Sequence, residues 1–186
     1  MFKPLSYDIK EVTKLFSQKR SLELRGLSNR LIREASMQND YSKAQLGVIA
    51  YALHKMESKN HFVNDEKWIL LKEGIVAGLK NALFAIQQSG EKQFAIKMQK
   101  VIDSIISIDS SLGNYAQNIY DKAKVKQASL AYSYGLSLSQ SAELTGADKK
   151  ELQSYIGFTT MHDEEKEIKS LSERVVELKN LVKENR

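Results

Sequence analysis

The stretch "HKMESKNH" holds side chains that can bind a metal ion. His54, Glu57 and His61 are three and four residues apart, so one uninterrupted helix would place them on a single face. Two histidines and a carboxylate can hold zinc. The spacing matches no metalloprotease or deaminase motif, and we expect Asn60 to end the helix before His61. We therefore interpret these histidines as surface residues and predict no metal site.

No other pattern indicates catalysis. The chain has no cysteine, which excludes thiolate nucleophiles and cysteine-held metals. The glycine-containing stretch "GIVAG" is not followed by the lysine and hydroxyl residue of a phosphate-binding loop, and no nucleophile elbow occurs. We predict no catalytic residues, no cofactor and a protein that is not an enzyme. Tyr120, Tyr132 and Tyr134 are interpreted as core or interface residues.

The composition is that of a globular chain, with 42% hydrophobic and 27% charged residues. The start, "MFKPLSYDIKEV", lacks the apolar core of a signal peptide, and the longest apolar run is "WILL". We expect a cytoplasmic protein that makes no membrane contact. Apolar residues recur every three or four positions, and the one proline, Pro4, precedes the periodic segments. The fold class is therefore predicted to be all-α.

Residues 1–112 are predicted to form a helical bundle. Ser6 is the expected first N-cap, and breaks are expected near Lys19, at residues 38–40 and in a loop at residues 60–65. The segment from Trp68 is the most apolar, so we expect its helix to lie at the centre of the bundle. Gly74 and Gly78 within it predict a close helix crossing, and Gly90 predicts its end.

The stretch "GLSLSQSAELTGADKKELQSYIG" predicts two short helices joined by a glycine turn. Ser137 and Gln140 form a capping-box pair, Gly146 supplies the turn, and the pattern of Asp148 and Glu151 repeats the capping arrangement. We assign these helices, with the one before them, to a module spanning residues 113–157. Leu152, Tyr155 and Ile156 are expected to face its core.

This module resembles the helix-turn-helix of prokaryotic repressors, with small Ala142, Gly146 and aliphatic Leu152 at the characteristic intervals. The resemblance covers residues 120–157 and implies binding to double-stranded DNA, with residues 148–156 in the major groove. Base contacts would come from Lys149, Lys150, Gln153 and Ser154. Phosphate contacts would come from the start of the shorter helix and from the preceding helix, at Ser139, Gln140, Lys122, Lys124 and Lys126.

Residues 158–186 are predicted to form a C-terminal amphipathic helix with Thr160 as its N-cap. An apolar seam repeats by three and four at Ile168, Leu171, Val175, Leu178 and Val182. Alternating β-branched residues and leucine favour a parallel two-stranded coiled coil, and thus a homodimer. The seam is short, however, and Arg174 would face Lys179 of a parallel partner, so docking on the chain's own bundle or antiparallel pairing stays open. Since the repeat still runs at Arg186, a longer natural chain is also possible.

Two functions follow from these patterns. The first is a dimeric transcription regulator that reads DNA. The second is a helical interaction protein in which the helix-turn-helix only packs and the basic first third meets an acidic protein partner or RNA. Of the net charge of +5, the whole surplus lies in residues 1–60, whose basic residues include Lys10, Lys14, Lys19, Arg20, Arg25, Arg30 and Arg33.

Overall fold

The computed structural model describes residues 3–88, 90–112 and 118–164. These residues form nine helices and contain no strand, which confirms the all-α fold class. The first four helices are α1 (Lys3–Ser17), α2 (Ser21–Gln38), α3 (Tyr41–Glu57) and α4 (Asn60–Val63). They are followed by α5 (Trp68–Gln88), α6 (Glu91–Leu112), α7 (Ile119–Ser133), α8 (Leu138–Thr145) and α9 (Lys149–Glu164).

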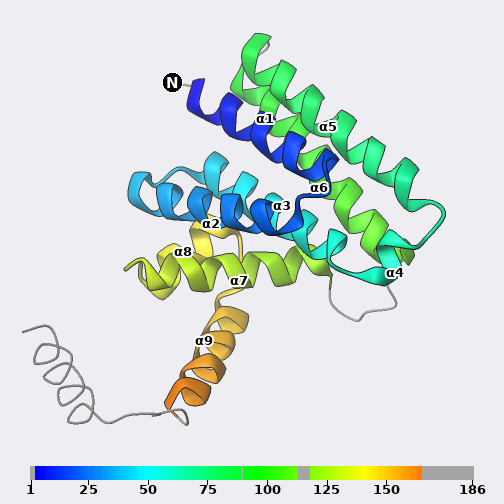
Figure 1. The fold of residues 1–186 in the computed structure, drawn as a ribbon. Helices are drawn as coiled ribbons and strands as arrows, with labels where there is room; N and C mark the ends of the chain where they lie inside the picture. Colours follow the sequence, from blue (N-terminus) through cyan, green and yellow to red (C-terminus); the bar gives the residue numbers. More distant parts are fainter. Residues whose placement is uncertain (1–2, 89, 113–117, 165–186) are drawn as a thin grey trace, which may run out of the picture. The chain divides into compact units, whose positions relative to one another are not determined.

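The chain divides into two compact units, residues 1–152 and residues 153–186. In the first unit, α2 and α3 lie between a group formed by α1, α5 and α6 and a group formed by α7 and α8 (Figure 1). This unit continues past residue 112, where the sequence suggests a boundary, because α7 packs on α2, α3 and α6. No helix of the described residues is long and apolar enough to cross a membrane.

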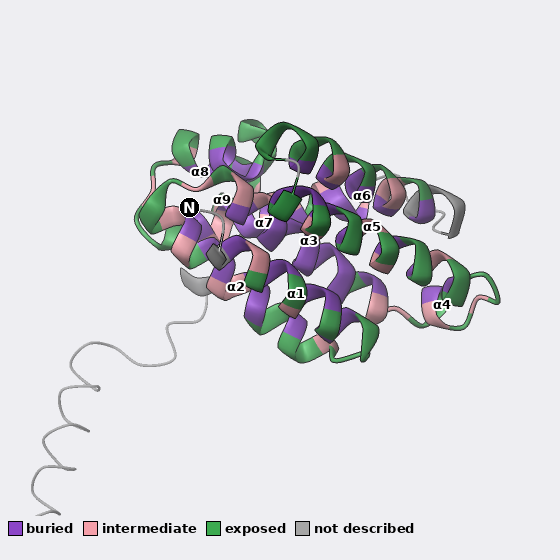
Figure 2. Cartoon of the chain, turned by 90° about the horizontal axis from the view of Figure 1, so that it is seen from above, coloured by how far each residue is buried: buried purple, intermediate pink, exposed green. Residues whose placement is uncertain are grey.

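The central helix is α3, and the expectation that the helix from Trp68 would be central is wrong. α3 contacts α1, α2, α4, α6, α7 and α8, whereas α5 packs chiefly on α1 and α6. Every residue of α3 from Leu46 to His54 is buried (Figure 2). On α5, by contrast, Ile69 and Leu70 are 70% and 73% exposed. α5 is therefore apolar over so much of its surface because some of its apolar side chains are exposed, and not because the helix is central.

Close helix crossings are made by two glycines. A Cβ at Gly78 would lie 2.9 Å from Val101 Cγ2, so the predicted crossing exists between α5 and α6. Gly74, the other half of that prediction, has no heavy atom within 4 Å of a Cβ position. The second crossing is at Gly47, where a Cβ would lie 3.0 Å from Ile32 Cδ1 of α2. At both of these described positions, a larger residue would require the facing side chain to shift.

The breaks between helices mostly follow the sequence. Lys19 and Asn39 have φ values of 57° and 51°, and Gly90 has a φ of 84°, so the chain turns at the expected places. The helix starts differ more. α1 begins at Lys3 and not after Ser6, and α4 occupies part of the expected loop because Phe62 is fully buried and its ring lies 6.0 Å from that of Trp68.

α9 runs without interruption from Lys149 to Glu164, passing through Gly157 and Thr160. Gly157 therefore does not end a helix, and Thr160 is not the N-cap of a separate one. A single glycine in a helix costs about 1 kcal/mol relative to alanine, which a continuous helix tolerates. The boundary that the sequence suggests between residues 157 and 158 lies inside this helix.

Candidate nucleic-acid interface

The turn between α7 and α8 sets where α8 begins. Gly135 has a φ of 99°, a conformation that glycine adopts without steric cost. Ser137 then caps α8, accepting a hydrogen bond from the Gln140 N–H at 3.2 Å, while the Gln140 side-chain oxygen accepts one from the Ser137 N–H at 3.0 Å. The capping box that the sequence predicts is therefore complete.

The turn between α8 and α9 is equally well defined. Gly146 ends α8 with a φ of 70°, and the Ala147 N–H donates to the Ala142 carbonyl at 3.0 Å. Asp148 caps α9: its Oδ1 accepts the N–H groups of Lys150 and Glu151, both at 2.9 Å. The carboxylate of Asp148 is therefore held at the helix start by its backbone bonds.

α8 is fixed to α3 and α7 through its inner face. Leu144 is 3% exposed, and Ser141 and Thr145 are also buried. The buried hydroxyl of Thr145 donates to the Ser141 carbonyl at 2.9 Å, which satisfies it within the helix. At the start of α9, Leu152 is fully buried, as the sequence predicts, while Tyr155 and Ile156 are half-buried.

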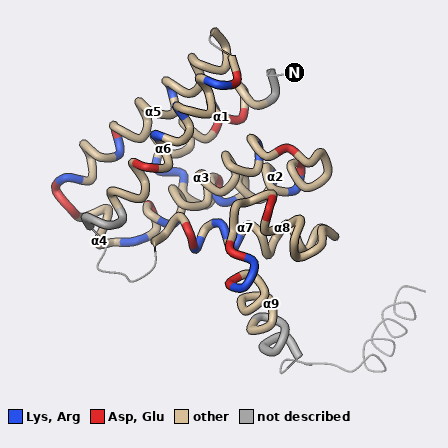
Figure 3. The backbone as a smooth tube through the Cα atoms, turned by 180° about the vertical axis from the view of Figure 1, so that it is seen from behind, with Lys and Arg blue, Asp and Glu red and all other residues tan. Residues whose placement is uncertain are grey.

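All four candidate base-contact residues are exposed. Lys149 and Lys150 occupy the first turn of α9, and Gln153 and Ser154 follow one turn later. Neither lysine has an ion-pair partner among the described residues. Basic and acidic segments alternate at this helix start (Figure 3). The local charge is therefore mixed, because the two exposed lysines lie between Asp148 and Glu151 in the sequence.

The candidate phosphate-contact residues differ in how accessible they are. Ser139, Gln140 and Lys122 are exposed, whereas Lys124 and Lys126 are half-buried. Lys124 Nζ lies 2.7 Å from Asp121 Oδ1 and 5.7 Å from the ring centre of Tyr120. This ion pair holds Lys124 against its own helix, and Gln140 already uses its side chain in the capping box.

The tyrosines of α7 divide into two kinds. Tyr120 is a core residue at 7% exposure, and its burial, together with the neighbouring carboxylate of Asp121, raises its pKa. Tyr132 and Tyr134 are 43% and 41% exposed at the end of the helix. The expectation of a core position is therefore wrong for these two tyrosines, and an interface role stays a prediction.

The histidine cluster is not assembled. His54 is buried, against the expectation of a surface position, and its Nδ1 lies 2.8 Å from Ser21 Oγ and 3.0 Å from the Ser21 carbonyl oxygen. Glu57 pairs with Lys72 at 2.6 Å, and His61 is exposed on α4. Among the described residues, no three histidine or carboxylate side chains are grouped so that they could hold a metal ion.

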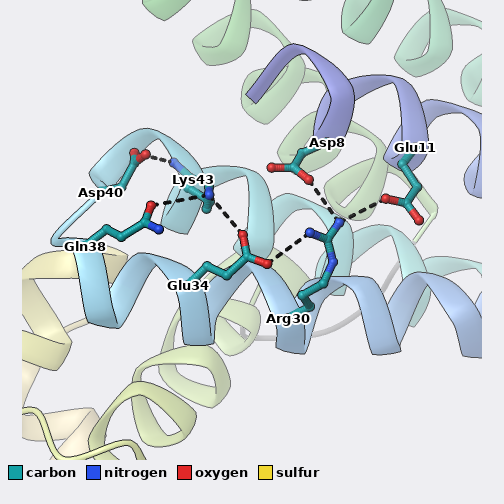
Figure 4. Close-up of polar contacts among 7 residues, drawn as sticks. All are labelled: Asp8, Glu11, Arg30, Glu34, Gln38, Asp40 and Lys43. Atoms are coloured by element: carbon teal, nitrogen blue, oxygen red, sulfur yellow. Dashed lines mark hydrogen bonds and ion pairs between the residues drawn. The ribbon is translucent and has the colours of Figure 1, made fainter. Parts of the chain in front are cut away.

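The basic first third is partly neutralised by a polar network that joins α1, α2 and α3. Arg30 contacts Asp8, Glu11 and Glu34 at 2.9 to 3.1 Å, and Lys43 also pairs with Glu34, at 2.9 Å (Figure 4). Burial alone would lower the pKa of Arg30, but Asp8 and Glu34 outweigh it and raise the pKa. Arg30 and Glu34 are four residues apart on α2, so spacing alone allows that pair. The contacts of Arg30 with Asp8 and Glu11 join different helices and depend on helix packing.

The predicted coiled-coil seam lies outside the described residues: Ile168, Leu171, Val175, Leu178 and Val182.

Comparisons with known proteins assign neither a family nor a function to this chain. No protein-family model, curated protein or solved structure matches this chain.

Proposed function

We propose that this protein binds double-stranded DNA and acts as a transcription regulator, with the start of α9 in the major groove. One observation carries the proposal. α8 and α9 are both capped, and they are joined through Gly146, whose backbone is in the left-handed conformation. Two of the exposed candidate base-contact residues precede the buried Leu152 of α9 and two follow it. These features support the proposal, because the second helix of a DNA-binding helix-turn-helix offers its first residues to base edges.

The exposed side chains suit base edges chemically. Lysine donates to the O6 and N7 of guanine, glutamine bonds adenine in a bidentate manner, and serine bonds several groups. Lys149 or Lys150 and Gln153 would therefore supply discrimination, with Ser154 as a weaker contact. Backbone N–H groups at the start of α8, beside the exposed Ser139, would donate hydrogen bonds to a phosphate.

The proposal includes a homodimer. Residues 118–157 contain five basic and four acidic side chains, a small surplus for a single DNA-binding module. Two copies on one duplex would add their phosphate contacts and read two half-sites. The seam from Ile168 to Val182 is the proposed dimer contact, and a cytoplasmic location goes with this function.

Matched variants test the site. Lys92 is the second residue of α6 and exposed, just as Lys150 is the second residue of α9, and Gln93 beside it is also exposed. Anisotropy with labelled duplex DNA should show weaker binding for Lys149→Ala and Lys150→Ala and no change for Lys92→Ala. Each lost phosphate contact would reduce the salt slope by about 0.9, whereas a lost base contact would leave the slope nearly unchanged.

Sequence preference gives the sharper readout. Gln153→Ala should relax discrimination at one base pair by about 1–3 kcal/mol, and Gln93→Ala should not. The melting temperatures of these variants should stay close to that of the wild type, because all five side chains are exposed. If the α9 variants and their α6 controls bind equally well, α8 and α9 are not the DNA-binding surface.

A second candidate is a protein-interaction scaffold, favoured by the exposed apolar side chains Ile69, Leu70 and Phe84 of α5. In that case a basic first third would meet an acidic protein or RNA. Charge reversal at Arg30 is a poor test, since it would also break the network with Asp8 and Glu34. Arg33 is exposed and has no ion-pair partner among the described residues, so Arg33→Glu tests this surface cleanly.

A further inference from the structure

A groove of about 540 Å³ lies between α1 and α2, away from α8 and α9. α1 contributes Tyr7, Lys10 and Lys14 to its lining, and α2 contributes Gly26, Leu27 and Arg30. Ligand sites commonly have volumes of about 300–1,000 Å³, so the groove has the size of a small-molecule site.

The charge of the groove comes from two lysines. Of its basic residues, Arg20 pairs with Glu23 and Arg30 with Glu11, so both arginines are compensated. Lys10 and Lys14 are exposed and have no ion-pair partner among the described residues. They are four residues apart on α1, hence on one face and about 6 Å apart along the helix axis. This pair presents two positive charges to a ligand with two or more negative ones.

An aromatic ring stands beside these charges. Tyr7 is 64% exposed, and its position three residues before Lys10 places it on the same stripe of α1. Across the groove, Gly26 has no heavy atom within 4 Å of a Cβ position, which leaves open space in the lining. Leu15 and Leu27, 6% and 5% exposed, supply apolar surface. Ring, open space and apolar surface together suit a flat heterocycle.

We propose that the α1–α2 groove binds a nucleoside phosphate, with the base stacked on Tyr7 and the phosphates held by Lys10 and Lys14. Stacking on tyrosine and charge pairing with lysine are the two contacts that proteins use for nucleotides without sequence preference. The phosphate-bearing nucleoside comes either from a free nucleotide or from a single RNA strand, which share this chemistry. The groove is separate from α8 and α9, so this proposal stands or falls independently of DNA binding.

Titration of the full chain with the fluorescent nucleotide mant-ADP tests the groove. Tyr7→Ser should weaken binding about tenfold, in line with one lost stacking contact, and Lys10→Ala and Lys14→Ala should each weaken it several-fold and flatten its salt dependence. Lys80→Ala, exposed on α5 and outside both the lining and the basic first third, is the control and should bind as the wild type does.

Gly26→Leu distinguishes occupancy of the groove from general stability. Gly26 is an exposed position inside α2, where leucine favours the helix by several tenths of a kcal/mol or more, yet the side chain would fill part of the groove. The expected result is an equal or higher melting temperature together with lost mant-ADP binding. An unchanged mant-ADP affinity in this folded variant would place the ligand elsewhere.

Two competitors complete the experiment. Unlabelled ADP that displaces the probe at far lower concentration than pyrophosphate supports the nucleoside, and tighter displacement by a uridine decamer than by ADP identifies the RNA strand as the source. Pyrophosphate that competes as well as ADP, with Tyr7→Ser unaffected, would reduce the groove to a simple anion site and overturn the proposal. Absence of mant-ADP binding up to millimolar concentration would overturn it as well.

Discussion

The phenolic oxygen of Tyr41 lies 3.2 Å from Oε1 of Glu143 and donates a hydrogen bond to it. The bond joins the first residue of α3 to α8, across a separation of 102 residues in the sequence. α8 also packs directly on α3 and α7, so its position is set by the central helix of the bundle. The capped start of α8 is therefore part of the bundle's own packing and is not carried on a separate linker.

The two glycines of α5 should respond in opposite directions to the same substitution. Gly78→Ala should lower the free energy of unfolding by about 1–3 kcal/mol, because the new Cβ would lie 2.9 Å from Val101 Cγ2. Gly74→Ala should raise it by about 0.5–1 kcal/mol, because nothing lies within 4 Å and alanine favours the helix. Urea unfolding measures both, and equal effects would contradict the α5–α6 crossing.

Breaking the buried ion pair of Lys72 and Glu57 should change the free energy of unfolding more than either glycine substitution. Their side chains are 11% and 4% exposed, and Lys72 Nζ also lies 4.8 Å from the ring centre of Phe16. Lys72→Met should cost about 3–5 kcal/mol, since it leaves the Glu57 carboxylate buried without its partner. The double variant Lys72→Met/Glu57→Leu should recover most of that loss. If the double variant is no more stable than the single one, burial of the carboxylate is not the cause.

His54 should make stability depend on pH. Burial lowers its pKa below the ordinary value of 6.5, outweighing the hydrogen bond with the Ser21 carbonyl. A lowered folded-state pKa means that the unfolded chain binds the proton more readily, so this stability is complete above pH 6.5 and is lost as the pH falls through the folded-state value. Urea unfolding between pH 8 and 5 should show the loss, and His54→Asn should reduce it. An unchanged pH dependence in His54→Asn would assign the effect to other groups.

Urea unfolding should also measure how much the capping box of α8 stabilises the fold. Ser137→Ala removes the acceptor of the Gln140 N–H and should cost about 0.5–2 kcal/mol. Gly146→Ala should cost about 1–2 kcal/mol, because its φ of 70° is strained for residues that carry a Cβ. Ser139→Ala, exposed in the same first turn of α8, is the control and should have little effect on stability.

Local signals predicted the turns on either side of α8, although Ser6 and Thr160 do not begin helices. Ser137, Gln140 and Gly146 act through neighbours within a few residues, so their roles follow from spacing and are found as expected. The apolar residues of α6 repeat every three or four positions, and those of the repeat are all buried: Phe94, Met98, Val101, Ile105 and Ile108.

Features that depend on tertiary contacts could not be read in this way. α3 carries Lys43 and His54, which hide its central position, and both are buried because Glu34 and Ser21 from α2 satisfy them. The pairing of Arg30 with Asp8 depends on how α1 and α2 pack, which periodicity does not specify. For the candidate interface, the sequence anticipated the exposure of Lys149 and Gln153. The ion pair of Lys124 with Asp121 is local to α7, three residues apart, and spacing alone could have indicated it.

The central claim is DNA binding, and one measurement tests it most directly: fluorescence anisotropy of the full chain with a labelled random duplex, from about 50 to 200 mM salt. The account predicts binding that weakens by a decade or more over this range, since each neutralised phosphate contributes about 0.9 to the logarithmic slope. The absence of binding at the lowest salt concentration would contradict it. In that case the stretch from Gly135 to Gly157 would serve packing alone, and the exposed side chains of α5 would become the first surface to examine.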